Sequence, residues 1–374
     1  MTSLKRKLLA NLKNIGLPVI RRKLIIFESD DWGSNRMPSV KDFKGLVKDG
    51  VLSGKPSHYD INDTIARASD LEVLFDALNM VKDHTGRNAV FTPFVNVANP
   101  DFEKIENSGF QNYYWEDFFT TLEKTGEKTA LSGLWKQGIE NGIFDPAFHG
   151  REHLCVPLWL KHLKDENSLV RKAFKHHFYS VPIEGLPVKL NAFRPALFFS
   201  HPDQVPFLKH SIMEGMEKMK SLFNKSPKVF CPPNGISHKL FDEASSLEGI
   251  KTIMANRLRP EPNGKGGLTK IFYPNGSKNQ WGQKYYQRNC AFEPTYSADA
   301  VNFSLMQIEA AFRWFKPAII STHRVNYIGS LNPANRERGI AALKTLLKEV
   351  VKRWPDVEFI SSNEFSDILH KTDK

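Results

Sequence analysis

Cysteine is scarce in this chain of 374 residues, and long apolar runs are absent. The three cysteines are odd in number and widely spaced, which argues against a disulfide framework or a zinc knuckle and is typical of a reducing compartment. No stretch approaches the roughly 18 consecutive apolar residues that a transmembrane helix needs. Apolar residues still make up 41% of the chain, enough for a large core in one big α/β domain or two modest ones.

Acidic residues are missing from the first 23 positions, which contain seven Lys and Arg residues and form a basic N-terminal arm. The rest of the chain carries only about +4 of the net charge of +11, so nucleic-acid binding has little support. Leu4, Leu8, Leu12 and Ile15 share one helical face of the arm. Two interpretations stay open: a surface helix that contacts an anionic membrane, or an ordinary amphipathic helix packed on the domain. The arm is too polar for a signal peptide and no cleavage site follows, so we expect a cytoplasmic protein, peripheral to the inner face of the membrane in the first case.

The stretch from Leu24 to Ser34 combines a buried strand with two adjacent carboxylates. Leu24–Phe27 is a short apolar run typical of a core strand, and Asp30 and Asp31 follow it closely. Consecutive residues at the end of a strand point in different directions, so one carboxylate can bind a metal while the other handles a proton. The plain alternative is a strand that ends in a polar turn, with Asp31 as a cap.

Strands and helices alternate along the remaining chain, and charged residues follow the strand ends. This alternation predicts parallel β/α packing. A basic, helix-rich segment near residues 157–203 interrupts the alternation, and we interpret it as an insertion. We expect strands over residues 89–97, 228–231, 250–255, 318–322 and 357–361, and helices over residues 69–84, 130–141, 205–223 and 336–353.

Two histidines four residues apart, His149 and His153, form a second group of polar side chains. On a helix or a tight turn they would face the same way, and Asp31 is the natural third ligand for a zinc-type metal, which usually takes three protein ligands and one water. Together with Glu152 they also match the H-x-x-E-H pattern of inverzincin metallopeptidases, in which the Glu is the base. Gly150 argues for a turn here, whereas that pattern normally lies in a regular helix.

Four motifs follow one another along the chain: Phe27–Asp31, His149–His153 with the preceding Gly142–Phe148, Cys231–Gly235 and Ile319–His323. In this order they make the sequence resemble the polysaccharide deacetylases, the NodB-homology carbohydrate esterases. The strand followed by Asp-Asp and the His-x-x-x-His are the specific motifs; the Pro-rich motif and the strand that ends in His are looser. The resemblance spans roughly Leu24 to Leu369.

The resemblance implies a distorted (β/α)7-type barrel, with residues 24–374 as one catalytic domain. It implies that Asp31, His149 and His153 bind one divalent ion, zinc first, with cobalt, nickel or manganese as alternatives. Asp30 would be the general base and His323 the general acid. The expected partner is an acetylated carbohydrate, most simply an N-acetylated precursor of a surface polysaccharide.

Three departures from the family pattern bear on activity. Gly150 stands where Ser or Thr is usual, Cys231 stands where an Arg normally orients the base, and Asn234 stands where a Tyr often supplies an oxyanion donor. Arg194 or Arg324 could replace the missing Arg; if neither does, the fold would serve as a binding protein without activity. We expect substrate contacts from Trp32, Arg194, Pro233 and Asn234.

Overall fold

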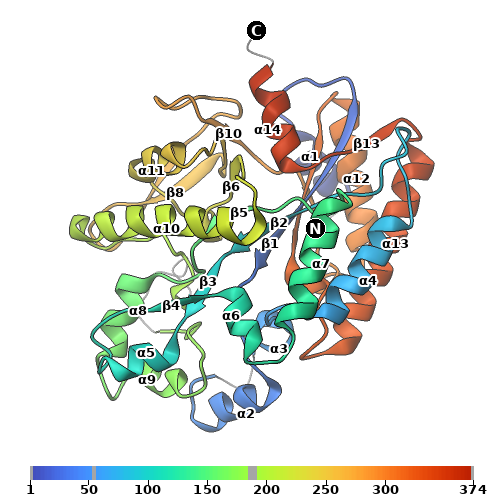
Figure 1. Cartoon of the computed structure of the whole chain (residues 1–374). Helices are drawn as coiled ribbons and strands as arrows, with labels where there is room; N and C mark the ends of the chain where they lie inside the picture. Colours follow the sequence, from blue (N-terminus) through green and yellow to red (C-terminus); the bar gives the residue numbers. More distant parts are fainter. Residues whose placement is uncertain (1–2, 53–55, 184–191, 372–374) are drawn as a thin grey trace.

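The computed structural model describes residues 3–52, 56–183 and 192–371. Its centre is a parallel sheet with the strand order β10-β7-β6-β5-β2-β1-β12-β11, and β13 pairs with β1. Helices surround the sheet (Figure 1). The strands are β1 (Lys23–Trp32), β2 (Phe91–Asn96), β5 (Ala147–Gly150), β6 (Val229–Phe230), β7 (Thr252–Met254), β10 (Lys284–Tyr286), β11 (Cys290–Ala291), β12 (Ala318–His323) and β13 (Val357–Phe359).

The sheet curls into a ring with one seam, between the edge strands β10 and β11. Tyr286 ends β10 and Cys290 begins β11, so the chain can span at most about 14 Å between the two edges. A curled parallel sheet with helices outside it confirms the predicted distorted (β/α) barrel. The outer helices include α4 (Ala68–Asn79), α7 (Lys128–Glu140), α10 (Val205–Phe223), α12 (Ala300–Arg313) and α13 (Pro333–Arg353), and α14 (Ser362–Lys371) follows β13.

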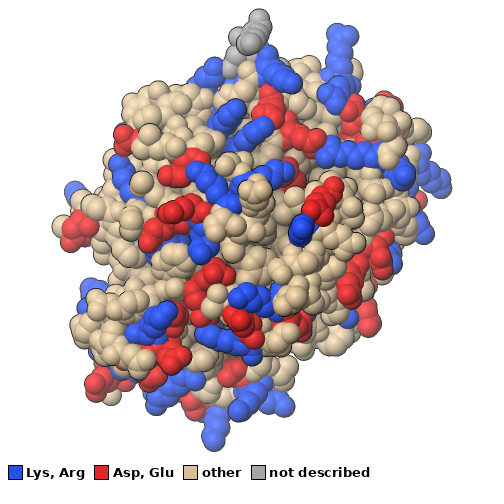
Figure 2. Space-filling model, viewed as in Figure 1, with Lys and Arg blue, Asp and Glu red and all other residues tan. Residues whose placement is uncertain are grey.

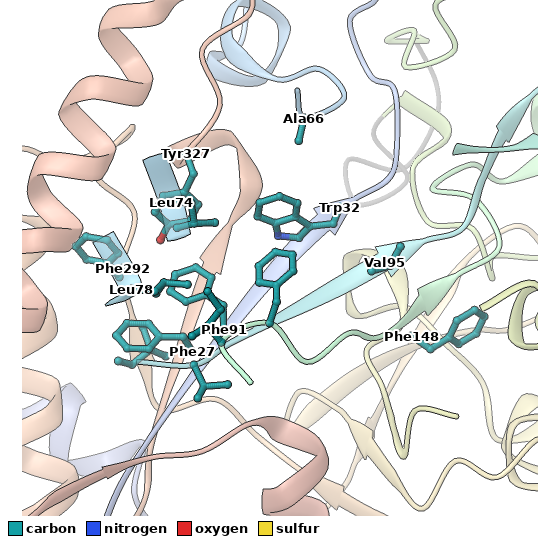
Figure 3. Packing of buried hydrophobic residues seen from close by; sticks show 14 of the residues in the cluster. Phe27, Trp32, Ala66, Leu74, Leu78, Phe91, Val95, Phe148, Phe292 and Tyr327 are labelled. Atoms are coloured by element: carbon teal, nitrogen blue, oxygen red, sulfur yellow. The ribbon is translucent and has the colours of Figure 1, made fainter. Parts of the chain in front are cut away.

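Side chains of β1 alternate between two cores. Ile25 and Phe27 belong to the largest buried cluster, between the sheet and helices α4 and α13. Figure 3 shows Phe27 beside Phe91 of β2 in this cluster, and their ring centroids are 5.1 Å apart. Leu24 and Ile26 belong to a different cluster, made largely of residues from the other strands. Because successive side chains of a strand point to opposite faces, even-numbered residues of β1 face the inside of the barrel.

The predicted insertion forms a cap rather than a separate domain. Figure 1 shows α2 (Val40–Lys48), α5 (Phe102–Asn107), α8 (Val156–Leu163) and α9 (Leu169–Phe174) gathered at one end of the molecule. Trp159 and Phe174 of the insertion pack with Leu46 of α2 in a second buried cluster. Short elements complete the fold: α3 (His58–Asn62), α6 (Phe118–Glu123), α11 (Asp242–Leu247), a β3–β4 pair (Ala98–Pro100 with Trp115–Asp117) and a β8–β9 hairpin (Leu258–Pro262 with Leu268–Phe272).

The N-terminal arm is packed on the domain by one side only. Its helix α1 (Ser3–Leu12) lies against α12, where Arg6 pairs with Asp299 at 3.2 Å and Trp314 Nε1 donates to Asn11 Oδ1 at 2.9 Å. The predicted leucine face points outward instead, with Leu4 79% exposed. No described helix combines the length and apolar character needed to cross a bilayer. On the face in view in Figure 2, basic side chains are interspersed with acidic ones.

Candidate active site

The two adjacent carboxylates of β1 are separated by a break in the strand. Asp30 keeps the strand register, opposite His323 of β12, and so points into the barrel. Asp31 has a φ of +74°, a left-handed conformation that a non-glycine residue seldom adopts, and the pairing of β1 with β2 shifts register between Ser29 and Trp32. This bulge turns Asp31 out of the alternation, and the two carboxylates can therefore have different neighbours.

Asp31 lies between the two predicted histidine ligands. Its Oδ1 is 3.4 Å from His149 Nε2 and 3.2 Å from His153 Nε2, and all three side chains are buried. One ligand atom from each lies within 4.8 Å of the others. Burial alone would raise the pKa of Asp31, but its close contacts with the two imidazoles hold that pKa well below its usual value. The structure thus brings the predicted triad together.

The orientation of the His149 ring suits the binding of a divalent ion by Asp31, His149 and His153. His149 Nδ1 lies 2.6 Å from the carbonyl oxygen of Cys231; a carbonyl can only accept, so Nδ1 donates. In the neutral ring Nε2 then carries a lone pair, which faces the carboxylate of Asp31. Two facing acceptors are satisfied by a cation between them, and a backbone carbonyl on the second nitrogen is the usual support for a metal-binding histidine.

Gly150 allows the chain to turn between the two histidines. His149 belongs to the end of β5, and His153 follows in a turn rather than on the same helix. Gly150 has a φ of +123°, and a Cβ at this position would lie 3.4 Å from Pro233 Cγ. A Ser or Thr would be strained here, which accounts for the departure from the family pattern.

Arg288 orients the candidate base, Asp30. It donates to both carboxylate oxygens, at 2.6 and 2.7 Å, and its Nε donates to Glu28 at 2.5 Å. Burial would raise the pKa of Asp30, but the Arg288 guanidinium lowers it. Arg288 lies at the seam between β10 and β11, where it fixes the Asp30 carboxylate.

The two arginines proposed from the sequence for this role lie elsewhere, so that prediction is wrong. Arg324 is fully buried and donates to Asp63 at 2.7 Å, and Arg194 lies with its guanidinium over the ring of Tyr59 at 4.7 Å. Cys231 Sγ is 3.9 Å from Asp30 Oδ1, as expected of a buried thiol that fills the place of the missing guanidinium.

His323 ends β12 on the other side of Asp30, and the distance from its Nε2 to Asp30 Oδ2 is 3.9 Å. Its Nδ1 is 2.6 Å from Glu293 Oε1, and Asn326 Nδ2 donates to the second oxygen of Glu293 at 2.7 Å. Burial lowers the pKa of His323, but Glu293 together with Asp31 and Asp30 raises it to about 10. The ring is therefore protonated at neutral pH and can donate a proton from Nε2.

The four residues predicted to contact substrate have different environments. Trp32 is fully buried among apolar residues of the outer core (Figure 3). Its ring packs edge-on against Trp135 and Phe144, so the prediction of a substrate contact is wrong. Pro233 is buried against the turn after β5, and Asn234 is exposed at the rim in a left-handed conformation. Arg194 borders a pocket that the predicted ligands Asp31 and His153 also line; its other lining residues are Ser34, Arg36, Asp63, Tyr179 and Ser180.

Glu152, the base of the peptidase alternative, faces away from this group. Its carboxylate accepts from Arg151 Nε at 2.6 Å and from the Tyr113 hydroxyl at 3.3 Å. Burial raises its pKa, and no described metal-binding group includes it. Because His149 and His153 also do not share a helix, the geometry of an H-x-x-E-H peptidase is absent from this part of the chain.

In the comparisons with known proteins, only solved structures are similar to this chain. No family model matches the chain, and no curated protein does. A protein of Mycobacterium smegmatis assigned as a polysaccharide deacetylase is 12% identical over 96% of this chain and 94% of its own, with a TM-score of 0.44. One of Parabacteroides distasonis assigned as a glycoside hydrolase/deacetylase is 8% identical over 94% and 72%, with a TM-score of 0.48. A Pseudomonas aeruginosa protein assigned as a polysaccharide deacetylase is 11% identical over 94% and 92%, with a TM-score of 0.43. At this similarity we draw no conclusion about activity from these proteins.

Proposed function

We propose that this protein is a metal-dependent deacetylase that hydrolyses the N-acetyl group of a carbohydrate. One observation carries the proposal: a carboxylate held by a buried arginine, Asp30, lies one residue from a buried Asp-His-His group and 3.9 Å from a histidine with a raised pKa. Amide hydrolysis needs a base for water, an acid for the leaving nitrogen and a Lewis acid for the carbonyl. The site offers residues for all three.

A divalent ion on Asp31, His149 and His153, with zinc the first candidate, would polarise the acyl carbonyl and lower the pKa of a water molecule. Asp30 is ionised and fixed by Arg288, so it can accept the proton of the attacking water. His323 carries a proton on Nε2 and can give it to the nitrogen as the C–N bond breaks. The products are acetate and a free amino group, and the two proton transfers balance. The carbohydrate part of the proposal rests on the ordered motifs of the sequence.

Acetate release from N-acetylated amino-sugar oligomers tests the proposal. Asp30→Asn and His323→Ala should each lower kcat by about 10²- to 10⁴-fold, the usual effect of removing a general base or acid. Glu152→Gln is the matched control, because Glu152 is a buried carboxylate directly before the predicted ligand His153 but turned away from the predicted metal ligands. It should cost at most about 10- to 100-fold. If Glu152→Gln is the most damaging change, or if peptides are cleaved and no acetylated sugar is, the proposal fails.

We also propose that the arm contacts an anionic membrane surface. Its support is the outward leucine face of α1, with Leu4, Leu8 and Leu12 all exposed, on a helix that also carries the exposed cations Lys5 and Lys7. An amphipathic helix with a basic border binds such surfaces through apolar burial and charge attraction. A double variant, Leu4→Ser with Leu8→Ser, should bind anionic vesicles more weakly than the original protein. Its rate of acetate release from a small soluble sugar should be unchanged. Equal vesicle binding by the variant and the original protein would contradict this role.

A further inference from the structure

Two residues that line the pocket beside the predicted metal ligands have buried hydrogen-bonding atoms without partners in the described part of the chain. Arg36 is 8% exposed, and its Nε and Nη1 have no hydrogen-bond partner among the described residues. Ser180 is 3% exposed, and its Oγ likewise has no described partner. Both residues line the same pocket as Asp31 and His153. A buried donor that stays unpaired costs free energy, so donors gathered in this way point to an acceptor that binds between them.

A second guanidinium, that of Arg194, lies at the same pocket. Arg194 is half-buried, and among the described residues no carboxylate lies within ion-pair distance of it. Arg36 and Arg194 both lie over the ring of Tyr59, with Cζ at 4.4 and 4.7 Å from its centroid. Tyr59 therefore contacts both of the guanidinium groups that belong to the lining of this pocket.

The carboxylates around this pocket leave the positive charge in place. Asp60 accepts a hydrogen bond from one guanidinium nitrogen of Arg36, Nη2, at 3.2 Å. The other two nitrogens, Nε and Nη1, have no partner among the described residues. Asp63 is already paired with Arg324 at 2.7 Å, and Asp31 faces the two histidines. No carboxylate in the described part of the chain therefore neutralises Arg194 or fills the unpaired positions of Arg36.

We propose that the substrate carries an anionic group, a carboxylate or a phosphate, close to the acetamido group that is hydrolysed, and that Arg36, Arg194 and Ser180 bind it. Guanidinium groups match carboxylate and phosphate with paired, charge-assisted hydrogen bonds. A neutral sugar hydroxyl would supply no charge to balance Arg194, which has no carboxylate partner among the described residues. This inference rests on the proposed deacetylase function, because it places the anion next to the reacting group.

The first test compares substrates that differ only in charge, in metal-loaded protein: N-acetylglucosamine, N-acetylglucosaminuronic acid and N-acetylglucosamine phosphate. Acetate release should show a kcat/KM at least about tenfold higher for one of the two anionic sugars, and the preferred one tells carboxylate from phosphate. Arg194→Met should raise the KM for that sugar by about tenfold or more, the size expected for a lost charge-assisted contact. Arg194→Lys should recover part of the loss, and kcat should change less than KM.

Arg353→Met is the matched control, since Arg353 pairs with Glu349 on the surface of α13 and its loss changes the net charge equally. A second measurement is independent of turnover: calorimetric binding of inorganic phosphate and glucuronate to the original protein and to the two variants. We expect weaker binding in Arg194→Met alone.

The outcomes separate the two proposals. Equal kcat/KM for neutral and anionic sugars, with Arg194→Met and Arg353→Met alike, overturns the anion site and leaves the deacetylase intact. Anion binding that depends on Arg194, without acetate release from any sugar, overturns the deacetylase and keeps the anion site. An equal fall in kcat on all three sugars in Arg194→Met overturns the inference in favour of a general catalytic role.

Discussion

Arg288 joins the stability of the barrel to the chemistry of Asp30, and Arg288→Met tests both. The residue makes two hydrogen bonds to Asp30 and one to Glu28. Glu28 is fully buried, and among the described residues its further side-chain partners are the Tyr286 and Ser362 hydroxyls. Removal of the guanidinium leaves Glu28 without a described cation inside the barrel, and it leaves Asp30 with His323 at 3.9 Å. Loss of one partner of a buried ion pair costs about 3–5 kcal/mol, a large part of a typical unfolding free energy of about 5–15 kcal/mol.

The activity of Arg288→Met should change in its pH dependence. Without Arg288 the pKa of Asp30 rises, so the acidic limb of kcat/KM should move to higher pH. The contribution of Asp30 to the free energy of unfolding also decreases at acidic pH, because the pKa of Asp30 is lower in the folded than in the unfolded chain. This contribution is complete above the unfolded pKa of about 3.9 and is lost as the pH falls through the folded pKa.

Arg324→Met is the control for this experiment, because it also breaks a buried arginine–aspartate pair, with Asp63, and leaves Asp30 untouched. Urea unfolding should show similar losses for both variants, whereas only Arg288→Met should move the acidic limb. The reasoning is refuted if Arg288→Met unfolds at the urea concentration of the original protein, or if the two variants have the same pH profile.

Two further substitutions test other parts of the site. Glu293→Gln removes the main cause that raises the pKa of His323, so the alkaline limb of the pH–rate profile should move to lower pH. An alkaline limb at the same pH as in the original protein would show that Glu293 does not keep His323 protonated. Gly33→Ala places a Cβ 2.1 Å from the carbonyl oxygen of Asn96 at a φ of +83° and should cost at least about 2 kcal/mol by thermal unfolding. Gly86→Ala has the same φ with no atom within 4 Å, and an equal loss in both would mean that the backbone conformation, not the close approach, sets the cost.

Six strands of the sheet, β1, β2, β6, β7, β12 and β13, could be predicted because they follow from local apolar patterns, whereas β5, β10 and β11 were not predicted. An apolar run of four residues locates β1. The polar residues at the ends of β1, β5 and β12 meet because parallel strands end at the same side of a sheet. Trp32 was assigned wrongly for a physical reason. The bulge at Asp31 shifts the alternation, and it places the Trp32 ring in the outer core instead of at the rim.

Arg288 and Glu293 could not be identified from the sequence. They flank β11, which has two residues, and β10 next to it has three; strands this short carry no periodicity to reveal which side chains face the barrel. Arg288 contacts Asp30 of β1 and Glu293 contacts His323 of β12, and these contacts depend on the curling of the sheet. The only sequence signal was a charged residue between two short apolar stretches, and such a signal is common on protein surfaces.

Metal content is the most direct test of the central claim, that Asp31, His149 and His153 hold a divalent ion. Elemental analysis of protein purified without chelator should give about one divalent ion per chain, the stoichiometry of a three-ligand site. His149→Ala and His153→Ala should each lose it, while Asp30→Asn should keep it and lose turnover. Full occupancy in both histidine variants, or no ion in the original protein after incubation with zinc, would contradict the claim.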